Sequence, residues 1–373
     1  MKFKINRNLL LENLNNVSKA LSTRNIIPIL NGIKFNLTKE GLFLTATDNE
    51  IVIESFIDKK DIKLIKEEGA LVIHGRYILD IVRKLPDEEI DIEESDGNKV
   101  IIFTDNSKYN LNCFNLNDFP NITFNDSENN INIPTLEFKN IINEVIFACS
   151  TQESRPLLTG VNIKIIGNFL ECTATDSYRL AKRIYNLNDI IKENINIVIP
   201  SRNISEFVKL LTKEDINVNI HLFNNKIIFK YDNMIYQSSL LNGTYPNTDN
   251  SIPNEFEIEY EISLNDLYNA VDRASLLTSS KEKNIIEFVS NEDVITIMSM
   301  SQEIGKVEEK LKGNKLKGNN IKISFSAKYM LEALKTFDSE KLKLLLNGEI
   351  KPIVIKSEEN PDLIQLILPI KTF

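Results

Sequence analysis

Side chains that commonly perform nucleophilic, acid–base or metal chemistry are few in this 373-residue chain, and they lie far apart in the sequence. The histidines and cysteines are His74, His221, Cys113, Cys149 and Cys172. Neither histidine flanks a serine or cysteine in a nucleophile motif, and these residues lack the spacing of a zinc cluster. Neither GxxxxGKS/T nor GxGxxG occurs, so no phosphate-cradling loop is recognisable. The sequence therefore predicts no catalytic residue, no metal site and no cofactor.

Two aspartates invite comparison with a catalytic carboxylate pair, because each ends a copy of the sequence TATD. Asp48 closes TATD at 45–48, and Asp176 closes TATD at 173–176. Equivalent copies in separate segments of the chain are not expected to meet in one site. An aspartate that follows a strand commonly accepts hydrogen bonds from the next backbone amides, so we predict turn or helix-capping roles for both.

The composition and the charge balance restrict the class of protein. With 44 basic and 53 acidic residues the formal net charge is −9, which excludes a uniformly basic nucleic-acid coat but allows a local basic surface. Hydrophobic residues make up 42%, enough to bury the cores of two or three domains. The sparse cysteines fit a reducing compartment, no apolar run is long enough to span a membrane, and MKFKINRNLL has no apolar signal segment. We predict a cytoplasmic protein without a membrane partner.

Internal repeats define the organisation of the chain. The two TATD copies are 128 residues apart, and so are PILNGIKF (28–35) and PLLTGVNI (156–163). Three further segments resemble one another at a spacing of 126 residues: GRYILDIVRKL (75–85), SRNISEFVKLL (201–211) and AKYMLEALKTF (327–337). A period of about 124 residues is domain-sized and too long for a solenoid repeat. We predict three domains of one fold at 1–124, 125–252 and 253–373.

Each repeat has the same predicted elements. Apolar residues spaced three and four apart predict helices at 6–21, 75–85, 135–150, 201–213, 263–280 and 326–337. Ser263 followed by Asp266 resembles a capping box at the start of one of these helices. Runs such as GLFLTATD, NFLECTATD and DVITIMSM predict strands between the helices. The predicted fold class is α+β, with the two helices of each domain on one face of an antiparallel sheet.

The second helix of each repeat carries a recurring charge pattern. A basic residue is followed by an acid four positions on and by another base seven positions on, and these positions share a helix face. The three sets are Arg76, Asp80 and Arg83; Arg202, Glu206 and Lys209; and Lys328, Glu332 and Lys335. The pattern fits either a solvated face with weak ion pairs or a basic surface for a polyanion. Because the predicted helices are together net basic on an acidic chain, we predict phosphate contacts that do not read sequence.

The repeated TATD, ATDSYRLA (174–181), DFPN (118–121) and the terminal LPI (368–370) resemble the bacterial replicative sliding clamp, the beta subunit of DNA polymerase III. The resemblance covers the whole chain in the family's domain order. It implies three tandem DNA-clamp domains, dimerised head-to-tail into a homodimeric ring with helices around the hole and sheets outside. It further implies a processivity factor of DNA replication that encircles double-stranded DNA, slides without sequence specificity, and tethers the alpha-type polymerase subunit, the clamp loader and other clamp-binding-motif or repair proteins. Such a protein is non-catalytic by itself, although it belongs to a DNA-directed DNA polymerase, a nucleotidyltransferase.

The resemblance also assigns residues to three surfaces. For DNA it implies Arg24, Arg76, Gln152, Arg155 and Arg202, and the charge pattern adds Arg83, Lys209 and Lys328. For partner peptides it implies an apolar pocket between the second and third domains, formed by Leu158, Thr175, Ser177, Tyr178, Arg179, Leu180, Pro246, Tyr329, Pro352, Leu366, Leu368, Pro369 and Ile370. For the dimer contact it implies Tyr109, Leu276 and Leu277 on the apolar side and the acidic residues Glu303, Glu308 and Glu309.

Some positions depart from the family pattern. Pro156 and Leu157 stand where the family often has aromatic residues, which predicts less stacking on DNA at that loop. Ser177 stands where glycine is frequent, and Asn250 stands where some relatives have a basic residue. We expect these two residues to alter the floor and the polar specificity of the pocket.

A second hypothesis belongs to a different class of protein. In it the same triplicated fold serves an enzyme or a small-molecule binder, with Tyr178 and Arg179 in a ligand pocket. The mass in solution separates the two hypotheses, because a clamp must be a dimer to form a ring.

Overall fold

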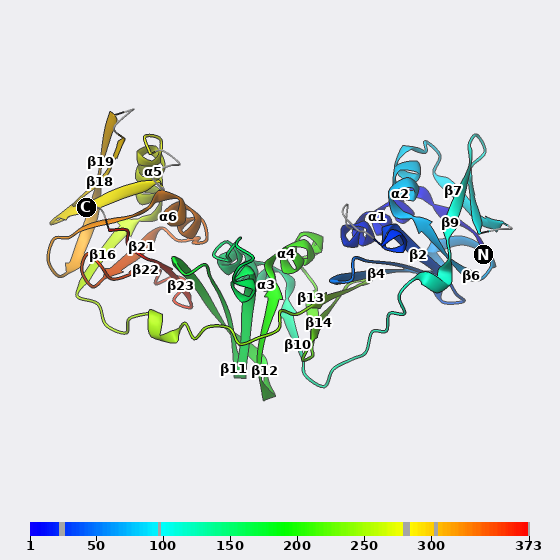
Figure 1. Ribbon diagram of the computed structural model, residues 1–373, viewed down its shortest axis with the longest axis horizontal. Coiled ribbons are helices and arrows are strands. Elements are labelled where there is room, and N and C mark those ends of the chain that lie inside the picture. The colour runs from blue at the N-terminus through cyan, green and yellow to red at the C-terminus, as the bar shows by residue number, and fades with distance from the viewer. Residues whose placement is uncertain (22–26, 96–97, 279–283, 302–304, 372–373) are drawn as a thin grey trace. The chain divides into compact units, whose positions relative to one another are not determined.

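The computed structural model (Figure 1) describes residues 1–21, 27–95, 98–278, 284–301 and 305–371. The chain divides into two compact units. Unit 1 comprises Met1–Phe138 and Arg202–Leu240, and unit 2 comprises Lys139–Ser201 and Leu241–Phe373. The strand pairings in both units are antiparallel, which confirms the predicted α+β class. Among the described residues, no helix is long and apolar enough to cross a membrane. The three domain boundaries remain a prediction.

Unit 1 is built on a 13-stranded sheet. In spatial order the strands are β10 (Asn130–Pro134), β13 (Asn217–Leu222), β14 (Lys226–Tyr231), β15 (Met234–Ser239), β4 (Ile51–Asp58), β3 (Gly41–Thr47), β2 (Gly32–Leu37), β6 (Gly69–His74), β9 (Lys108–Phe114), β8 (Lys99–Phe103), β7 (Glu89–Ser95), β1 (Lys2–Asn6) and β5 (Ile62–Glu67). The pairing of β15 with β4 joins strands from the first two predicted domains, with Tyr236 opposite Ile53. The sheet is therefore continuous across the predicted boundary at 124/125.

The helices of unit 1 are amphipathic, as the apolar spacing predicts. They are α1 (Arg7–Val17), α2 (Gly75–Lys84) and α4 (Ser201–Leu210), and α3 (Thr135–Ile146) runs from unit 1 into unit 2. Helix α1 packs on β3, β4 and α2 and buries Leu10, Leu14 and Val17 completely. Burial of each side chain of this size stabilises the folded state by about 1.5–3 kcal/mol. One face of the helix is therefore fixed on the sheet, and the opposite face is left to solvent.

Unit 2 is built on a 10-stranded sheet. In spatial order its strands are β11 (Gly160–Thr175), β12 (Arg179–Pro200), β23 (Leu363–Ile367), β22 (Ile353–Lys356), β21 (Lys341–Leu346), β16 (Ile258–Ser263), β19 (Gly305–Lys317), β18 (Val294–Ser301), β17 (Ile285–Asn291) and β20 (Lys322–Ser326). The pairing of β12 with β23 places Leu180 opposite Leu366, so the strand that follows the second TATD contacts a strand near the C-terminus.

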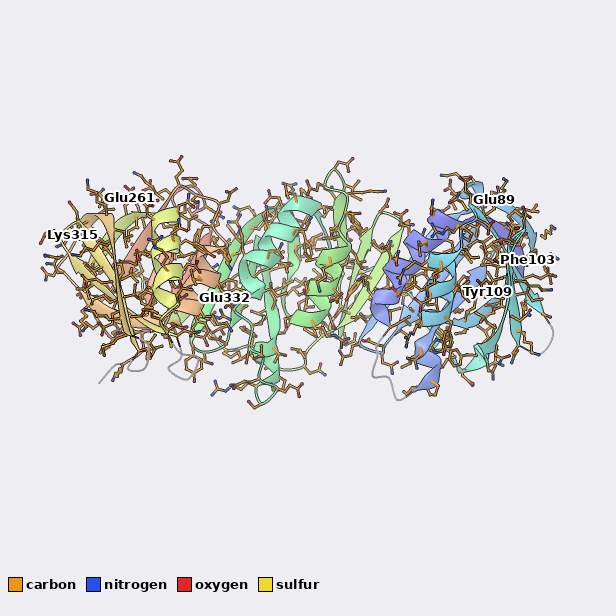
Figure 2. All side chains as sticks on the ribbon, turned by 90° about the horizontal axis from the view of Figure 1, so that it is seen from above. Glu89, Phe103, Tyr109, Glu261, Lys315 and Glu332 are labelled. Atoms are coloured by element: carbon orange, nitrogen blue, oxygen red, sulfur yellow. The ribbon has the colours of Figure 1, made fainter. Side chains whose placement is uncertain are left out.

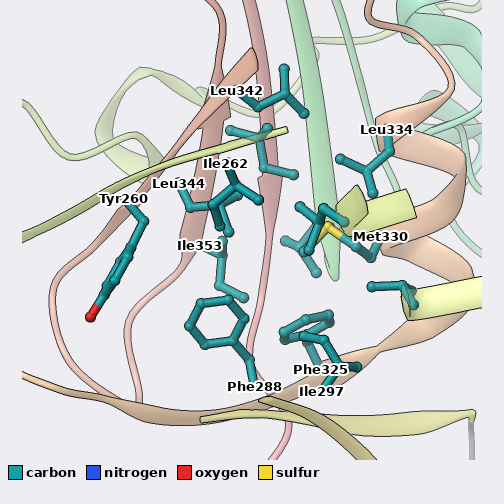
Figure 3. Packing of buried hydrophobic residues seen from close by; sticks show 14 of the residues in the cluster. Tyr260, Ile262, Phe288, Ile297, Phe325, Met330, Leu334, Leu342, Leu344 and Ile353 are labelled. Carbon is teal, nitrogen blue, oxygen red and sulfur yellow. The ribbon is translucent and has the colours of Figure 1, made fainter. Parts of the chain in front are cut away.

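Two helices, α5 (Leu264–Ser275) and α6 (Ala327–Leu334), pack against each other in unit 2. The core between them and the sheet is dominated by large buried side chains, including Tyr260, Phe288, Phe325 and Met330 (Figure 3). Short 3₁₀ turns complete the two units at η1 (Ser18–Ala20), η2 (Pro28–Asn31), η3 (Lys59–Asp61), η4 (Leu116–Asp118), η5 (Pro156–Thr159) and η6 (Asp249–Ser251).

The predicted helices are confirmed, although each is shorter than its apolar pattern. The helix predicted at 6–21 ends at Val17 and continues as the 3₁₀ turn η1. The helix predicted at 326–337 begins after Ser326, whose hydroxyl accepts a hydrogen bond from the Tyr329 amide, and it ends at Leu334. Ser263 caps α5 by accepting from the Asp266 amide at 3.3 Å, as its spacing predicts. Apolar periodicity continues through caps and 3₁₀ turns and therefore overestimates helix length.

The two TATD copies form the same turn, which confirms the structural role predicted for their aspartates. Asp48 Oδ1 accepts hydrogen bonds from the amides of Glu50 (3.0 Å) and Ile51 (2.9 Å). Asp176 Oδ1 accepts from the amides of Tyr178 (2.9 Å) and Arg179 (3.1 Å). The carboxylates therefore close a turn between two strands in each copy.

The turns share a left-handed residue directly after the aspartate. Asn49 has φ 76° and Ser177 has φ 77°. Glycine and asparagine adopt this conformation at the lowest energy, and serine pays a steric penalty because its Cβ approaches the carbonyl oxygen. A glycine at the position of Ser177 would avoid this penalty.

Candidate functional site

Two adjoining hollows lie in unit 2 and share Leu368. The first, of about 250 Å³, is called the turn hollow and is lined by Leu158, Thr175, Ser177, Arg179, Leu180, Pro246, Asn247, Thr248, Ser251, Leu366 and Leu368. The second, of about 530 Å³, is called the helix hollow and is lined by Tyr178, Asn284, Ser326, Lys328, Tyr329, Leu368, Pro369 and Ile370. The structure thus brings together the residues predicted for the partner pocket, with the exception of Pro352. That proline precedes β22 and lines neither hollow.

Arg179 is the structural centre of this region, because its guanidinium is held from several sides. Nε donates to Asp176 Oδ2 at 3.0 Å, Nη1 donates to Glu332 of α6, and Nη2 donates to the Phe147 carbonyl at 2.6 Å. The guanidinium also lies over the rings of Phe147 (5.1 Å) and Tyr329 (4.4 Å). The side chain is only 9% exposed. Arg179 therefore joins the TATD turn to α6 and separates the turn hollow from the ring of Tyr329.

The segment 246–251, which forms one wall of the turn hollow, is anchored by a buried lysine. Lys182 Nζ contacts Asp249 Oδ1 at 2.8 Å and Glu171 Oε2 at 2.8 Å, and the lysine side chain is 9% exposed. The hydrogen bond from Lys182 and its charge hold the pKa of the Asp249 carboxyl below its usual value. Burial lowers the pKa of Lys182, but Asp249 and Glu171 outweigh it and raise the pKa overall. These contacts fix η6 against β12.

The end of the chain closes both hollows. The Leu368 amide donates to the Tyr178 carbonyl at 2.9 Å, and the Ile370 amide donates to the Ser324 carbonyl at 2.7 Å. The residues after β23 are therefore held between the TATD turn and β20. Leu368 remains 37% exposed and Tyr178 61% exposed, so apolar surface is available at the rim.

Several lining residues were missed by the sequence reasoning. They are Asn247, Thr248, Ser251, Asn284 and Ser326, and Lys328 lines the helix hollow although the charge pattern assigned it to DNA. Asn247 ends TYPN (244–247), which resembles DFPN (118–121), and this similarity is a signal that could have marked the wall of the turn hollow. Asn284 comes from a loop, and no sequence pattern points to it.

The charge pattern is exposed and ion-paired on α2. Arg76 Nε lies 4.0 Å from Asp80 Oδ2, and Arg83 Nη1 lies 3.5 Å from Asp80 Oδ1. The Arg76 side chain is 83% exposed and that of Arg83 is 52% exposed. Both bases therefore remain accessible to a polyanion, while one acid offsets part of their charge.

The pattern on α4 is similar, with one added partner. Lys209 Nζ lies 2.7 Å from Glu206 Oε1, and Arg202 Nη2 lies 3.5 Å from Oδ2 of Asp48, in the first TATD turn. Arg202 is 63% exposed, whereas Asp48 is 6% exposed. On α6 the pattern differs, because Glu332 (Figure 2) binds Arg179 rather than completing a pair along the helix.

The remaining residues predicted for DNA lie in loops. Gln152 is exposed, and its backbone amide donates to Ser150 Oγ at 3.0 Å. Arg155 is also exposed, and its Nη1 donates to Ser177 Oγ at 2.9 Å, so it contacts a residue of the turn hollow. Arg24 lies outside the described residues.

The residues predicted for the dimer contact are divided between the two units. Tyr109 (Figure 2), on β9 of unit 1, is 38% exposed, and Leu276, after α5 of unit 2, is 75% exposed. Leu277 is partly buried. The Glu309 carboxylate binds Arg273 at 2.7 Å, which lowers the pKa of Glu309. Glu303 lies outside the described residues.

The acidic neighbour Glu308 is paired within its own strand region. Its carboxylate lies 3.6 Å from Lys306 Nζ and 3.7 Å from Lys310 Nζ. All three side chains are more than two-fifths exposed, so these pairs are weak and leave the surface charge open to a partner.

The cysteines are in surroundings that suppress thiolate formation. Burial raises the pKa of Cys113 to about 11 and that of Cys149 to about 12, and it raises the pKa of Cys172 further. A protonated, buried thiol is a poor nucleophile. Within the described residues, no group of His, Cys, Asp and Glu is arranged to hold a metal ion.

Comparison with known proteins agrees with this arrangement. Family models for the DNA polymerase III beta subunit match in chain order: the N-terminal domain at residues 1–123, the central domain at 132–247 and the C-terminal domain at 250–371. The beta sliding clamp of Staphylococcus epidermidis is 38% identical and that of Staphylococcus aureus is 37% identical, each over the full length of both chains. The crystal structure of the Bacillus subtilis sliding clamp superposes with a TM-score of 0.97 at 37% identity, and that of the Streptococcus pneumoniae beta chain with a TM-score of 0.95 at 33% identity, both covering the full chains.

The fold is therefore that of a clamp protein with three tandem domains, each mixing helices with antiparallel sheet. The chain belongs to the family of bacterial DNA polymerase III beta subunits, the beta sliding clamps, which are processivity factors of DNA replication.

Proposed function

We propose that two copies of this chain close head-to-tail into a ring around duplex DNA. The ring slides without reading sequence, and it tethers the replicative polymerase, the clamp loader and other proteins through the two hollows of unit 2. The subunit performs no chemistry itself and works in the bacterial cytoplasm, where the chromosome is. The domains at 1–124, 125–252 and 253–373 are the building blocks of the ring.

The exposed bases on α2 and α4 support non-specific DNA contact. Arg76, Arg83, Arg202 and Lys209 are each more than half exposed, and each lies within 4.0 Å of a carboxylate. A base with a nearby acid attracts phosphate less strongly than a free base, which favours contacts that form and break as the protein moves. Gln152, Arg155 and Arg24 are further DNA contacts in the proposal.

The paired hollows carry the proposal of partner binding. Each hollow combines apolar side chains with polar ones, and the two hollows adjoin at Leu368. Two adjoining hollows of this kind suit a peptide segment with an apolar anchor for each. Arg179 and Lys182 hold the walls in place in the unbound protein. The clamp therefore loses little conformational entropy when a partner binds.

Exposed apolar side chains support the dimer contact. Leu276 is 75% exposed, and Tyr109 is 38% exposed. A second copy would cover both, since one copy offers a surface of unit 1 to a surface of unit 2 of the other. Leu277 and the acidic residues Glu303, Glu308 and Glu309 complete this surface in the proposal.

Retention on DNA of different topology tests the proposal. The protein is loaded with a clamp loader and ATP onto nicked circular duplex, and half of the sample is linearised with a restriction enzyme. We expect retention on circles and loss from linear molecules, together with a dimer mass by light scattering. Equal loss from both substrates, or a monomer at micromolar concentration, contradicts the proposal.

A further inference from the structure

The helix hollow contains a charged residue that the sequence pattern assigned to DNA. Lys328 is the second residue of α6, and it lines the hollow together with Tyr329 and Leu368. The other described lining residues are apolar, aromatic or uncharged, so Lys328 is the one charged side chain among them. A cation at the border of an apolar hollow is suited to recognise an anion next to an apolar anchor.

The charge of Lys328 is not neutralised within the described part of the chain. No described side chain forms an ion pair or hydrogen bond with its ammonium group, and the side chain is exposed. The acid four positions on, Glu332, binds Arg179 instead. On α2 and α4 the corresponding bases, Arg76 and Arg202, each have a carboxylate within 4.0 Å. Among the described residues, Lys328 is therefore a base of the repeated pattern that lines a hollow and has no carboxylate partner, and its charge is left for a ligand.

The start of α6 adds to the positive potential at the same place. Ser326 caps the helix and also lines the helix hollow, and the first turn contains no acidic residue. The N-terminus of a helix has a partial positive charge that favours an anion within the first turn. The helix N-terminus and the Lys328 ammonium therefore both favour a negatively charged group in the hollow.

We propose that Lys328 is a specificity-determining residue of the partner pocket. It selects partner segments that carry an aspartate or glutamate side chain beside the apolar anchor in the helix hollow. The inference rests on the proposed binding of partner peptides and deepens it by naming the charge of the partner. It also reassigns Lys328 from the DNA surface to the pocket.

A positional scan with synthetic peptides tests the inference on the intact dimer. The probes are fluorescent, end-capped octapeptides with leucine and phenylalanine anchors, in which one Asp is moved through the other positions, and each has an Asn twin. Binding is measured by anisotropy with wild-type protein and with Lys328→Met. The matched control is Lys335→Met, which removes the same charge from the end of the same helix, at a residue that does not line the hollow.

At one or two adjacent positions we expect Asp to bind about two- to fivefold more tightly than Asn at low salt, as exposed ion pairs allow. We expect this preference to fall to about one in Lys328→Met, to survive in Lys335→Met, and to shrink at high salt. The absence of any Asp preference in the wild type, or its survival in Lys328→Met, overturns the inference. Failure of the Asn peptides to bind the wild type would instead contradict the proposed pocket. A loss of retention on nicked circles in Lys328→Met with the peptide preference unchanged would return the residue to the DNA surface.

Discussion

The most demanding consequence of the structure concerns the removal of the Arg179 guanidinium. Arg179→Met keeps much of the side-chain volume but leaves the carboxylates of Asp176 and Glu332 without their shared partner. The guanidinium is 9% exposed, Asp176 is 12% exposed and Glu332 is 33% exposed, so the contacts are substantially desolvated. Loss of one member of a buried charged network lowers the free energy of unfolding by about 3–5 kcal/mol. For a folding unit of this size, such a loss lowers the midpoint of thermal unfolding by about 6–20 °C.

Urea and thermal unfolding followed by circular dichroism measure this loss, and hydrogen exchange of α6 and β12 locates it in unit 2. The matched control is Arg83→Met, which breaks an exposed pair with Asp80 and is expected to cost less than about 1 kcal/mol. Adding Glu332→Gln to Arg179→Met is expected to recover part of the stability, because the unpaired charge is then removed. If Arg179→Met unfolds within about 0.5 kcal/mol of the wild type while losing peptide binding, the arginine is a ligand contact and our structural interpretation is wrong.

Three further predictions concern the pocket wall, the thiols and the dimer surface. The pKa of Asp249 is lowered in the folded protein, so its pair with Lys182 stabilises the fold above the ordinary carboxyl pKa of 3.8, and this stability is lost as the pH falls through the folded pKa. Asp249→Asn should abolish this acid dependence of the free energy of unfolding. An unchanged pH profile in the variant contradicts the assignment. Cys149 and Cys172 should react with a thiol reagent only after denaturation, since burial raises both pKa values; rapid labelling of the native protein would show that these sites open. Leu276→Asp should shift the mass in light scattering from dimer to monomer without lowering the helix content, and a persistent dimer would remove this residue from the contact.

Local patterns allowed much of the fold to be predicted. The helices follow from apolar spacing, and the turn role of Asp48 and Asp176 follows from a short polar side chain directly after a strand. Both depend on residues a few positions apart, for which sequence and geometry are closely linked. The continuity of the sheet through β15 and β4 was not predicted, because pairing between distant strands leaves no periodic signal.

The pocket could be located from the resemblance, but its electrostatics could not. The assignment of Lys328 to DNA followed from the recurring charge pattern, which treats the three second helices as equivalent. In the structure Glu332 binds Arg179, which lies 153 residues away in the sequence. Such a contact depends on how separate strands and helices pack, and a charge pattern on one helix does not contain that information.

The retention of loaded protein on linear duplex with free or blocked ends distinguishes a closed ring around DNA from binding by surface contact. After loading on a nicked circle and linearisation, one sample has bare ends and the other has both ends capped with a bulky protein. A closed ring is predicted to leave free ends rapidly and to remain on capped DNA with a lifetime close to that on circles. Equal lifetimes on free and capped ends would show binding by surface contact alone and would contradict the proposed ring.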